Sequence, residues 1–462
     1  MQRLVVLLIA VALGSGTMVT GACLIAPPPE CEPFAIAWNY DTSGFLETCG
    51  CSANQLGGIE RRATLIAKLR AQQPLVAIEG AHIVEDKGEF QLYKGETLIA
   101  MLNMMDYDAM MLGVREAQHG TEGITRLRDV ANFPCFSANL VLDNPASKPL
   151  PSTVLVQVPG ITIGITGVSQ PEAISFELPE GVAFTDPATT LDRVLPSLAK
   201  DADLIVLCLE GERTWLNDIV SRYQDTVDLF LSGDRNKATA DYQFSAEPPW
   251  LNNWELGKRL GIVNVDPVPD GFRFSALTLD ITEDIESNPD ILAYMDGTYR
   301  PQLKDRFFGN MKQDLEQIYL PPGTCGSCHT EAFNIFQLSR HNQALKTLDE
   351  VGQLYNPECM PCHVVYDPDR GELQALNCVA CHSNITENHI WDAVKDEVVR
   401  PEVPVAEYTF EWCVQCHTEE QSLPFKSHWP QYVKQIYHGG DMAAAEESAE
   451  CMGLDIDGEI PE

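Results

Sequence analysis

Basic residues are scarce in this chain of 462 residues. Lysine and arginine number 31 against 67 aspartates and glutamates, which gives a formal net charge of −36. Nucleic acids and anionic lipid headgroups are bound through basic patches, so this balance argues against both kinds of partner. An acidic surface keeps a protein soluble and can also attract a basic partner protein, and the composition is consistent with either role.

Long apolar segments are also scarce. The run at residues 5–13 is too short to cross a bilayer, and no other stretch is apolar enough to do so. The run follows Arg3 and precedes small residues, which is typical of an export signal over residues 1–22. The sequence Thr20-Gly21-Ala22-Cys23 resembles a bacterial lipobox and implies a lipid anchor on Cys23. Because Thr20 stands where leucine is usual, simple cleavage after Ala22 is the alternative.

The segment after this signal favours an extracytoplasmic location. Residues 23–33 contain Ala26-Pro27-Pro28-Pro29 and are predicted to form a tether. Leu24 follows Cys23, whereas lipoproteins kept at the inner membrane usually have aspartate there. We therefore expect a periplasmic or cell-surface lipoprotein, anchored by its acyl chains and assigned to the outer membrane.

Histidine is scarce in the first two thirds of the chain and abundant after them. Of ten histidines, only His82 and His119 precede residue 325. The C-terminal third carries four copies of the motif Cys-x-x-Cys-His: Cys325-Gly-Ser-Cys328-His329, Cys359-Met-Pro-Cys362-His363, Cys378-Val-Ala-Cys381-His382 and Cys413-Val-Gln-Cys416-His417.

Each motif has the spacing of a haem attachment site. Its two thiols can add to the two vinyl groups of a haem, and the adjacent histidine can then bind the iron. The chain is therefore predicted to carry four covalently bound haem c groups, with four proximal ligands: His329, His363, His382 and His417. A pair of zinc ribbons is the alternative, but zinc ribbons need no histidine after the second cysteine.

Four further histidines are candidates for the second axial position of these irons. They are His341, His389, His428 and His438. Two histidine ligands give a low-spin iron of low potential, which suits electron transfer better than catalysis. The alternative for any one of the four is a surface histidine without a ligand role.

The motif segment resembles the tetrahaem cytochrome family whose best-known member accepts electrons from hydroxylamine oxidoreductase. The likeness begins with the first motif and residues 336–344, continues with the third motif, and ends with the fourth motif, Pro424-Phe425 and Trp429. It covers roughly residues 320–440. It implies closely stacked haems that relay single electrons.

The same resemblance assigns distal ligands to three haems. It implies that His341, His389 and His438 bind iron from the distal side, whereas His428 matches no family position. One haem of the family can lack a sixth protein ligand. Here His428 could fill that position, or the iron of the second motif could stay open to a small molecule such as NO.

Six of the fifteen cysteines lie outside the haem motifs and the lipobox: Cys31, Cys49, Cys51, Cys135, Cys208 and Cys451. In an oxidising compartment some of them can pair. Cys49 and Cys51 are too close in sequence to bridge each other comfortably, and each could instead reach Cys31 or Cys135. The connectivity stays open at this point.

Residues 34–284 alternate short apolar strands with amphipathic helices. Strands are expected at 34–38, 75–78, 109–113, 154–158, 161–166, 204–208 and 229–231. Helices are expected at 58–71, 97–105 and 188–199, where apolar residues recur at helical spacing. This pattern predicts an α/β layered domain.

The later segments differ in composition. Helical spacing predicts a connector over 285–320, before Pro321-Pro322-Gly323. Residues 321–440 have few long apolar runs and are expected to form a mainly α cytochrome domain packed around its haems. Residues 441–462 carry acids and no base, which is typical of a solvated tail.

Residues 34–284 resemble the metallophosphatase domain of bacterial 5′-nucleotidases. The matching segments are 41–51, 56–66, 107–113 and 133–140. Such enzymes bind two metal ions through Asp and His side chains at strand ends and use them to activate a water molecule. The resemblance implies a metallophosphatase scaffold.

The first metal-binding residues of that family are mostly replaced here. Asp41 matches the first aspartate, but Ser43 stands where a histidine belongs, and His82 stands in place of the bridging aspartate. Gly113-Val114-Arg115-Glu116 replaces the family motif Gly-Asn-His-Glu. A cation placed beside Arg115 would be repelled.

The later family motifs are replaced as well. No histidine occurs near Glu210-Gly211 or in Gly233-Asp234-Arg235-Asn236, where the family has its last metal ligands. Asp41 and His82 are thus vestigial metallophosphatase positions, and no phosphoesterase activity is expected. His82 and His119 are either polar or surface residues, or additional haem ligands.

The two resemblances together predict an exported electron-transfer protein without catalytic residues, whose phosphatase-like domain serves as a scaffold, a docking surface or a ligand binder. Its partners would be redox proteins, and no nucleic acid. Two other functions stay open. One is a metal-dependent phosphoester or nucleotide hydrolase fused to a cytochrome, and the other is a multihaem reductase with one open iron.

Overall fold

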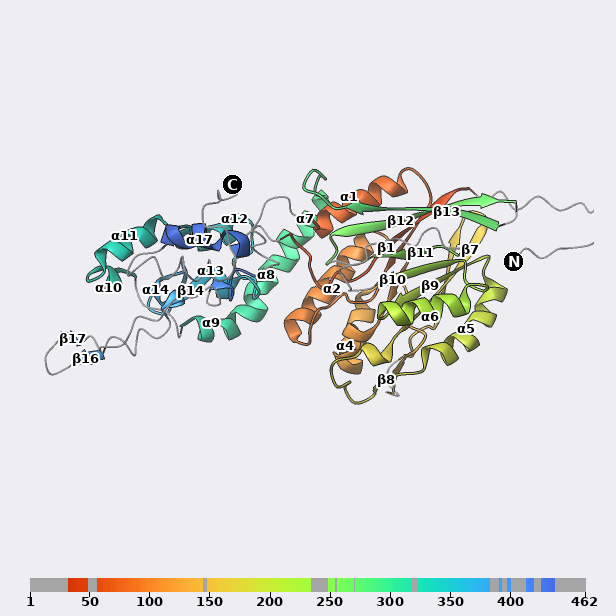
Figure 1. The fold of residues 1–462 in the computed structure, drawn as a ribbon, viewed down its shortest axis with the longest axis horizontal. Coiled ribbons are helices and arrows are strands. Elements are labelled where there is room, and N and C mark those ends of the chain that lie inside the picture. The colour runs from red at the N-terminus through yellow and green to blue at the C-terminus, as the bar shows by residue number, and fades with distance from the viewer. Residues whose placement is uncertain are drawn as a thin grey trace, which may run out of the picture. The chain divides into compact units, whose positions relative to one another are not determined.

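The computed structural model describes residues 32–48, 56–143, 148–233, 248–253, 256–269, 271–316, 322–382, 390–392, 397–399, 413–418 and 425–436. These residues fall into two compact units, the first ending at Ile291 and the second beginning at Leu292. Figure 1 labels the helices and strands of both units. The predicted signal (1–22) and acidic tail (441–462) lie outside the described residues.

The first unit contains two β-sheets, with the strand orders β13-β12-β1-β2-β3-β4 and β11-β10-β9-β7-β6. The strands of the first sheet are β1 (Phe34–Asn39), β2 (Leu75–Glu79), β3 (Ala109–Met111), β4 (Cys135–Phe136), β12 (Arg259–Val268) and β13 (Gly271–Asp280). Those of the second are β6 (Thr153–Val158), β7 (Ile161–Ser169), β9 (Leu204–Glu210), β10 (Leu229–Gly233) and β11 (Trp250–Asn252). Strands β1 to β4 run parallel, as do β7, β9, β10 and β11. Their carboxyl ends therefore gather at one edge of each sheet.

An apolar core fills the space between the two sheets. Alternate residues of β1 and β9 belong to it and are fully buried: Phe34, Ile36, Trp38, Leu204, Val206 and Cys208. This alternation follows from the two-residue period of a strand. The opposite face of the five-stranded sheet is covered by α5 (Pro187–Asp201) and α6 (Arg213–Tyr223).

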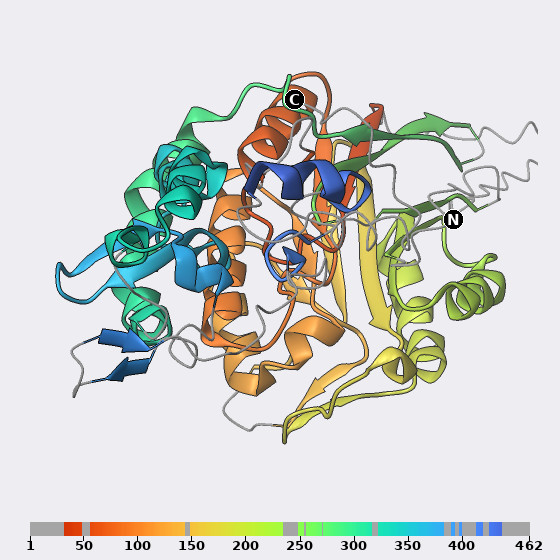
Figure 2. The ribbon, with the colours of Figure 1, turned by 60° about the vertical axis from the view of Figure 1, so that its left-hand side comes forward.

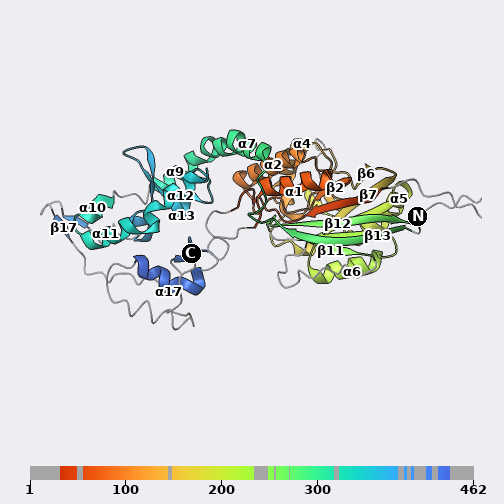
Figure 3. The same cartoon turned by 90° about the horizontal axis from the view of Figure 1, so that it is seen from above.

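Further helices complete a layered arrangement. They are α1 (Ile59–Arg70), α2 (Glu89–Met104), α3 (Val114–Ala117) and α4 (Gly120–Val130). In Figure 2 the orange helices lie on one side of the strands and the yellow-green helices α5 and α6 on the other. Seen from above, the layers follow one another from α1 through β12 and β11 to α6 (Figure 3). A short 3₁₀ helix, η1 (Pro171–Ala173), and the two-stranded pair β5 (Leu140–Leu142) and β8 (Val182–Phe184) complete the unit.

The sheets and helices confirm the α/β layered class for the first unit, with local differences from the sequence pattern. The helices expected at 58–71 and 188–199 occur as α1 and α5. The helix expected at 97–105 occurs as the second half of α2, which begins at Glu89. The sequence pattern missed the first half because that half buries Lys94 and Gly95 and so lacks a regular apolar spacing. Helices α4 and α6 and the hairpin β12–β13 have no counterpart among the expected elements.

The described part of the second unit is mainly helical. The helical run that was expected as a connector extends from Pro289 to Glu316 and contains two π-helical turns. Its parts are α7 (Pro289–Tyr294), η2 (Met295–Tyr299), α8 (Arg300–Leu303), η3 (Lys304–Phe308) and α9 (Gly309–Glu316).

Short helices and two hairpins follow this run. The helices are α10 (Pro322–Gly326), α11 (Thr330–Leu338), η4 (Arg340–Gln343), α12 (Ala344–Glu350), α13 (Met360–His363), α14 (Cys378–Cys381) and α17 (Phe425–Ile436). The strands are β14 (Val364–Asp367), β15 (Glu372–Ala375), β16 (Ile390–Asp392) and β17 (Glu397–Val399). A small apolar cluster joins α9, α12 and β14: Leu315, Leu348, Met360, Val364 and Tyr366. Within the described ranges, the helices are too short or too polar to cross a bilayer.

Candidate functional sites

Polar side chains converge where five strands of the first unit end. Asp41 and His82 follow β1 and β2, Glu116 lies on α3 just after β3, and Glu210 is the last residue of β9. Ser169 ends the neighbouring strand β7. We call these five residues the strand-end cluster. All five are buried.

The imidazole of His82 lies between two carboxylates of this cluster. Its Nε2 is 2.5 Å from Glu210 Oε1, and its Nδ1 is 3.5 Å from Asp41 Oδ1, an ion-pair contact longer than a good hydrogen bond. The residues are 7 % (His82), 5 % (Asp41) and 4 % (Glu210) exposed. A neutral imidazole has one nitrogen without a proton, and that nitrogen would repel a carboxylate oxygen. This geometry therefore favours the doubly protonated, positively charged ring.

The pKa values of the pair shift in the direction that this contact requires. Burial alone would lower the pKa of His82, but the charges of Glu210 and Asp41, together with the hydrogen bond to Glu210, outweigh it and raise the pKa to about 9. Burial alone would raise the pKa of Glu210, but His82 and hydrogen bonds from Ser169 and Val114 hold it below its usual value. The two groups thus form a buried ion pair near neutral pH.

Hydrogen bonds hold both carboxylates in place. The Ser169 hydroxyl donates to Glu210 Oε2 at 2.5 Å, and the backbone N–H of Val114 donates to the same oxygen at 3.0 Å. The Ser43 hydroxyl donates to Asp41 Oδ1 at 2.7 Å. A charged hydrogen bond of this kind is stronger than a neutral one, so the acceptors are well fixed.

Glu116 closes the cluster through the backbone. Its carboxylate accepts hydrogen bonds from the N–H groups of Ile83 at 2.8 Å, Gly113 at 2.9 Å and His82 at 3.4 Å. Burial raises the pKa of Glu116, more than its contacts with His82 and these donors lower it. The residue therefore ties the turn after β2 to the turn after β3.

The backbone around the cluster is strained. Asp41, Ser43 and His82 have positive φ angles of 60°, 48° and 64°. Residues other than glycine seldom adopt such angles, which cost roughly 1 kcal/mol or more each and are concentrated at functional sites. The strained backbone of the turns after β1 and β2 therefore makes them candidates for a functional site.

The cluster does not fit a two-metal site. Across the parts of the chain that the structure describes, no group of three or more His, Cys, Asp or Glu side chains is arranged to hold a metal ion. Both nitrogens of His82 face carboxylates, and the carboxylates accept hydrogen bonds from protein donors. Arg115, expected to oppose a cation here, instead pairs with Asp86 at 3.2 Å and is partly exposed.

Three members of the cluster, Glu116, Ser169 and Glu210, were not expected from the sequence to take part in a site. The signal for Glu210 was present, because it is a carboxylate that directly follows the apolar run Leu204 to Leu209. A charged residue at the end of a strand that is buried on both faces needs a partner. The other positions noted in the sequence, Asp234, Arg235 and Asn236, lie outside the described residues.

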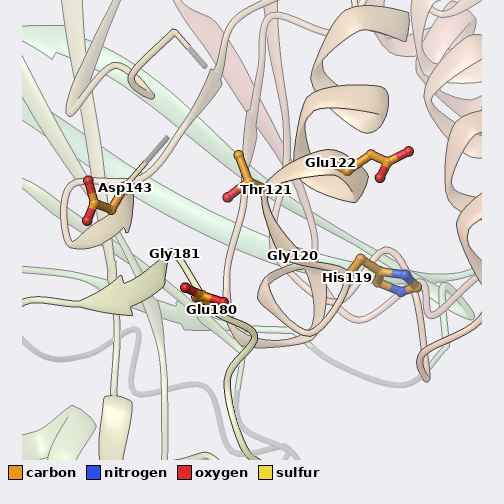
Figure 4. Close-up of a pocket in the computed structure, with 7 residues that line it drawn as sticks. All are labelled: His119, Gly120, Thr121, Glu122, Asp143, Glu180 and Gly181. Atoms are coloured by element: carbon orange, nitrogen blue, oxygen red, sulfur yellow. The ribbon is translucent and has the colours of Figure 1, made fainter. Parts of the chain in front are cut away.

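A separate surface pocket contains the other histidine of this unit. It has a volume of about 470 Å³ and is lined by His119, Gly120, Thr121, Glu122, Asp143, Glu180 and Gly181 (Figure 4). His119 Nε2 lies 3.0 Å from the backbone oxygen of Asp86, and burial lowers the pKa of the ring. Three of the seven lining residues are acidic and none is lysine or arginine, which suits neither a phosphate nor a carboxylate ligand.

In the second unit, the haem motifs share one backbone conformation. The histidine N–H bonds back to the carbonyl of the first cysteine in the first, third and fourth motifs, at 2.8, 2.8 and 2.9 Å. The second motif forms α13, a helical turn as well. A single helical turn places residues three and four apart on one side, so both thiols and the ring can face the same group.

Thiols of different motifs also lie next to one another. Cys325 is in hydrogen-bonding contact with Cys378, which lowers the pKa of Cys325 to about 7. Cys362 is in the same kind of contact with Cys416, which also lowers its pKa. The first motif therefore neighbours the third, and the second neighbours the fourth.

Two histidines of the second unit lie at the separation expected for ligands of one iron. The ring centroids of His341 and His417 are 6.0 Å apart, with an angle of 69° between the ring planes. Two imidazoles bound to opposite faces of one metal, each at about 2 Å, have centroids about 6 Å apart. Burial lowers the pKa of both rings, that of His417 to about 4, so both stay neutral as ligands must.

Neighbouring residues orient two of the proximal histidines. Phe425 of α17 stacks on His417 with a centroid distance of 4.0 Å and an interplanar angle of 8°. His363 Nδ1 lies 3.1 Å from the carbonyl oxygen of Ala344, at the start of α12. This bond puts the proton on Nδ1 and leaves Nε2 available for iron, the usual arrangement of a metal-binding histidine.

The other predicted ligands are placed in part. His329, His382 and His428 are described, and His428 lies on α17. His389 and His438 lie outside the described residues, as do Cys23, Cys31, Cys49, Cys51 and Cys451. Cys135 and Cys208 are buried in the first unit with free thiols, and burial raises the pKa of both.

Comparison with known proteins shows what each unit is similar to. Residues 324–418 match the family model Cytochrome c554 and c-prime. That match implies covalently bound haem c in the second unit, at motifs whose geometry fits it. The match includes all four Cys-x-x-Cys-His motifs and His341.

The first unit is similar to 5′-nucleotidases. The chain is 27 % identical to the mouse (Mus musculus) enzyme over 233 residues, which are 47 % of this chain and 39 % of the relative. It is 24 % identical to a venom 5′-nucleotidase of Crotalus adamanteus over 312 residues, 61 % of this chain and 52 % of the relative. The chain thus spans about half the length of such relatives, or less.

Solved structures agree on the fold. A putative 5′-nucleotidase from Staphylococcus aureus matches with a TM-score of 0.52 and 16 % identity, covering 82 % of this chain and 81 % of its own. The calcineurin-like phosphoesterase YfkN from Bacillus subtilis matches with a TM-score of 0.50 and 16 % identity, covering 59 % of this chain and 98 % of its own. The first unit therefore has a calcineurin-like metallophosphatase fold.

Proposed function

We propose that this protein is an exported tetrahaem c-type cytochrome that relays single electrons between redox proteins. The observation that carries the proposal is the set of four helical Cys-x-x-Cys-His turns, with His341 placed opposite His417. A haem bound at such a turn cycles between ferric and ferrous iron and so carries one electron. The chain's own residues attach, orient and shield these groups.

The ligands of the four haems are assigned in part. His329, His363, His382 and His417 are the proximal ligands, and each bonds the haem held by the two cysteines of its own motif. His341 is the distal partner of His417, because the two neutral rings lie at the separation for one iron. His389, His428 and His438 are the distal candidates for the other three motifs. If one of these does not bind, the iron of the second motif is the open one.

Neighbour relations between the motifs support electron transfer within the unit. The contacts of Cys325 with Cys378 and of Cys362 with Cys416 bring the motifs together in pairs. Each cysteine would hold the edge of its own haem. Haems held at two neighbouring motifs would lie close together, which would let electrons pass between them without a further carrier.

We also propose that the first unit has no phosphoesterase activity and serves as a scaffold or docking surface. The chemistry of that reaction needs two metal ions to activate water and to stabilise the phosphoryl oxygens. The strand-end cluster instead holds a histidine, and its carboxylates bind protein donors. We further propose a lipid anchor at Cys23 that holds the protein at the outer membrane.

One set of measurements on protein purified from its native host tests the proposal. The mass of the mature chain should exceed that of the bare polypeptide by four haems, and by acyl chains if Cys23 is modified. The double variant Cys359→Ser/Cys362→Ser should lose one haem. A colourless protein, or one with stoichiometric zinc in the second unit, would contradict the haem assignment.

The two other functions have their own readouts. Turnover of nucleotides or aryl phosphates in the presence of Mn²⁺ or Zn²⁺ would show a hydrolase. A high-spin signal in the oxidised spectrum and CO binding by the reduced protein would show an open iron and favour a reductase. We expect no turnover, and a low-spin spectrum for every haem that has two histidine ligands.

A further inference from the structure

His82 stands in place of the bridging aspartate of the metallophosphatases that the first unit resembles. Three buried carboxylates, those of Asp41, Glu116 and Glu210, converge on this point. Burying carboxylates without a nearby cation costs several kcal/mol each. The three carboxylates of this cluster therefore need a cation near them.

Nearby arginines are directed to other acids. Arg62 is fully buried and pairs with Glu79 at 3.0 Å, and Arg115 pairs with Asp86 at 3.2 Å. His82 contacts two of the three cluster carboxylates directly. Its imidazolium therefore offsets part of the negative charge of the three carboxylates.

Glycines from two strand ends make room for this arrangement. A Cβ on Gly113 would lie 1.9 Å from Glu210 Oε2, and a Cβ on Gly233 would lie 1.9 Å from the Tyr40 ring. The Tyr40 ring in turn lies 5.1 Å from the His82 ring, measured between centroids. The two glycines therefore leave room for the Glu210 and Tyr40 side chains beside His82.

We propose that the His82 imidazolium replaces the metal ions of the fold, so that the first unit folds and is stable without any divalent cation. This inference rests on the proposed loss of the two-metal site, but not on electron relay by the second unit. Substitution of this one residue should then make the stability of the first unit depend on a bound metal ion. Replacing His82 by aspartate leaves a cluster of buried carboxylates that needs a cation.

The test compares the full-length, haem-loaded protein with three variants. His82→Asp removes the cation and adds a carboxylate, and His82→Gln removes the cation only. His119→Gln, at the other histidine of the unit, is the matched control. The thermal unfolding of each protein is followed by calorimetry, once in EDTA and once in millimolar Mn²⁺. Bound manganese is measured after desalting.

We expect the unfolding temperature of the wild type and of His119→Gln to be the same in EDTA and in Mn²⁺, with no manganese retained. His82→Asp should unfold at a lower temperature in EDTA and recover in Mn²⁺, with about one manganese per chain retained. His82→Gln should unfold at the lower temperature in both solutions. These outcomes support the inference.

Two results would overturn it. One is a wild type that retains manganese or loses stability in EDTA, and this holds even if His82→Asp cannot be produced folded. The other is a His82→Gln variant as stable as the wild type. Failure of the proposed function would appear elsewhere, in the haem spectrum or as phosphoester turnover.

Discussion

Two histidines, His82 and the half-buried His417, show how neighbouring groups decide the charge of an imidazole. Burial lowers the pKa of His417 to about 4, and the charges of His341 and His363 act in the same direction. At His82 the carboxylates of Glu210 and Asp41 outweigh burial, and the pKa rises to about 9. One ring is thus kept neutral, as a metal ligand must be, while the other is kept charged.

The raised pKa of His82 makes the stability of the first unit depend on pH. A group whose pKa is higher in the folded state contributes stability that is complete below its unfolded pKa, about 6.5, and lost as the pH rises through the folded value. We expect the unfolding temperature to fall between about pH 7 and about pH 10, and the fall to be much smaller in His82→Gln. Calorimetry across this range measures it, with His119→Gln as a control that keeps the decline. An equal decline in the wild type and in His82→Gln would refute the assignment.

Thr347 is predicted to tune the haem of the second motif. The carbonyl oxygen of Ala344 accepts hydrogen bonds from both the Thr347 hydroxyl, at 2.7 Å, and His363 Nδ1, at 3.1 Å. Thr347→Val removes the competing donor, so the His363 bond strengthens and the ring becomes a better electron donor to iron. We expect one reduction potential to fall by roughly 20 mV, equivalent to about 0.5 kcal/mol for one electron. Spectropotentiometry measures this shift, and Thr347→Ser should behave as the wild type.

The turns after β2 and β3 depend on one side chain of α3. Glu116 accepts three backbone hydrogen bonds there, and its side chain is buried. Backbone N–H groups that lose their acceptor inside a protein cost about 1–3 kcal/mol each. The conformation of these turns is therefore set by a residue that is distant from β2 in sequence.

Truncation of Glu116 should destabilise the first unit severely. We expect Glu116→Ala to cost about 3 kcal/mol or more, because three buried N–H groups lose their partner. Glu116→Gln keeps an acceptor oxygen and should lose less than half as much. Chemical denaturation followed by circular dichroism gives both values, and equal losses in the two variants would show that the hydrogen bonds are not the cause.

The short helix η4 brings a histidine to a motif far along the chain. His341 lies on η4, and His417, whose ring it contacts, comes 76 residues later in the sequence. The contact between their rings links η4 to the fourth motif. The sequence of the fourth motif by itself does not show this contact, because His341 lies far away along the chain.

Removal of His341 should therefore change the haem of the fourth motif. We expect His341→Leu to convert one low-spin iron to a high-spin, five-coordinate form without loss of a haem. Electron paramagnetic resonance of the oxidised protein measures the spin state, and the mass reports the haem count. Selective loss of the neighbouring first-motif haem signal, with the fourth unchanged, would assign His341 to a different iron.

The net charge of −36 belongs to the whole molecule and acts at long range. Such a charge attracts cationic proteins and repels anionic ones before any contact forms. Salt screens this attraction over about 8 Å at physiological ionic strength. Partner selection is thus predicted to be electrostatic first and stereospecific second.

Ionic strength should separate basic from acidic redox partners. We expect the rate constant for electron transfer to a small basic cytochrome to fall about tenfold or more between low and physiological salt, whereas an acidic partner of similar potential should react faster as salt is added. Stopped-flow mixing at several salt concentrations measures both. A rate with the basic partner that is independent of salt would show that the acidic surface serves solubility alone.

The sequence by itself determined the chemistry of the second unit. Four Cys-x-x-Cys-His motifs can be recognised without a structure because attachment of a haem requires two thiols and a histidine within one helical turn. The alternation of apolar strands and helices also determined the α/β class of the first unit, since strand and helix periods are local properties. The hairpin β12–β13 and helices α4 and α6 did not follow from those periods.

Only the tertiary structure decided which residues act together. Glu210 and His82 are 128 positions apart, and nothing local to either residue shows that they form an ion pair. The same holds for His341 and His417, whose ring centroids are 6.0 Å apart although the residues are 76 positions apart in the sequence. Charge state and ligand pairing depend on distances across the fold, because electrostatic and metal-binding interactions act through space and not along the chain.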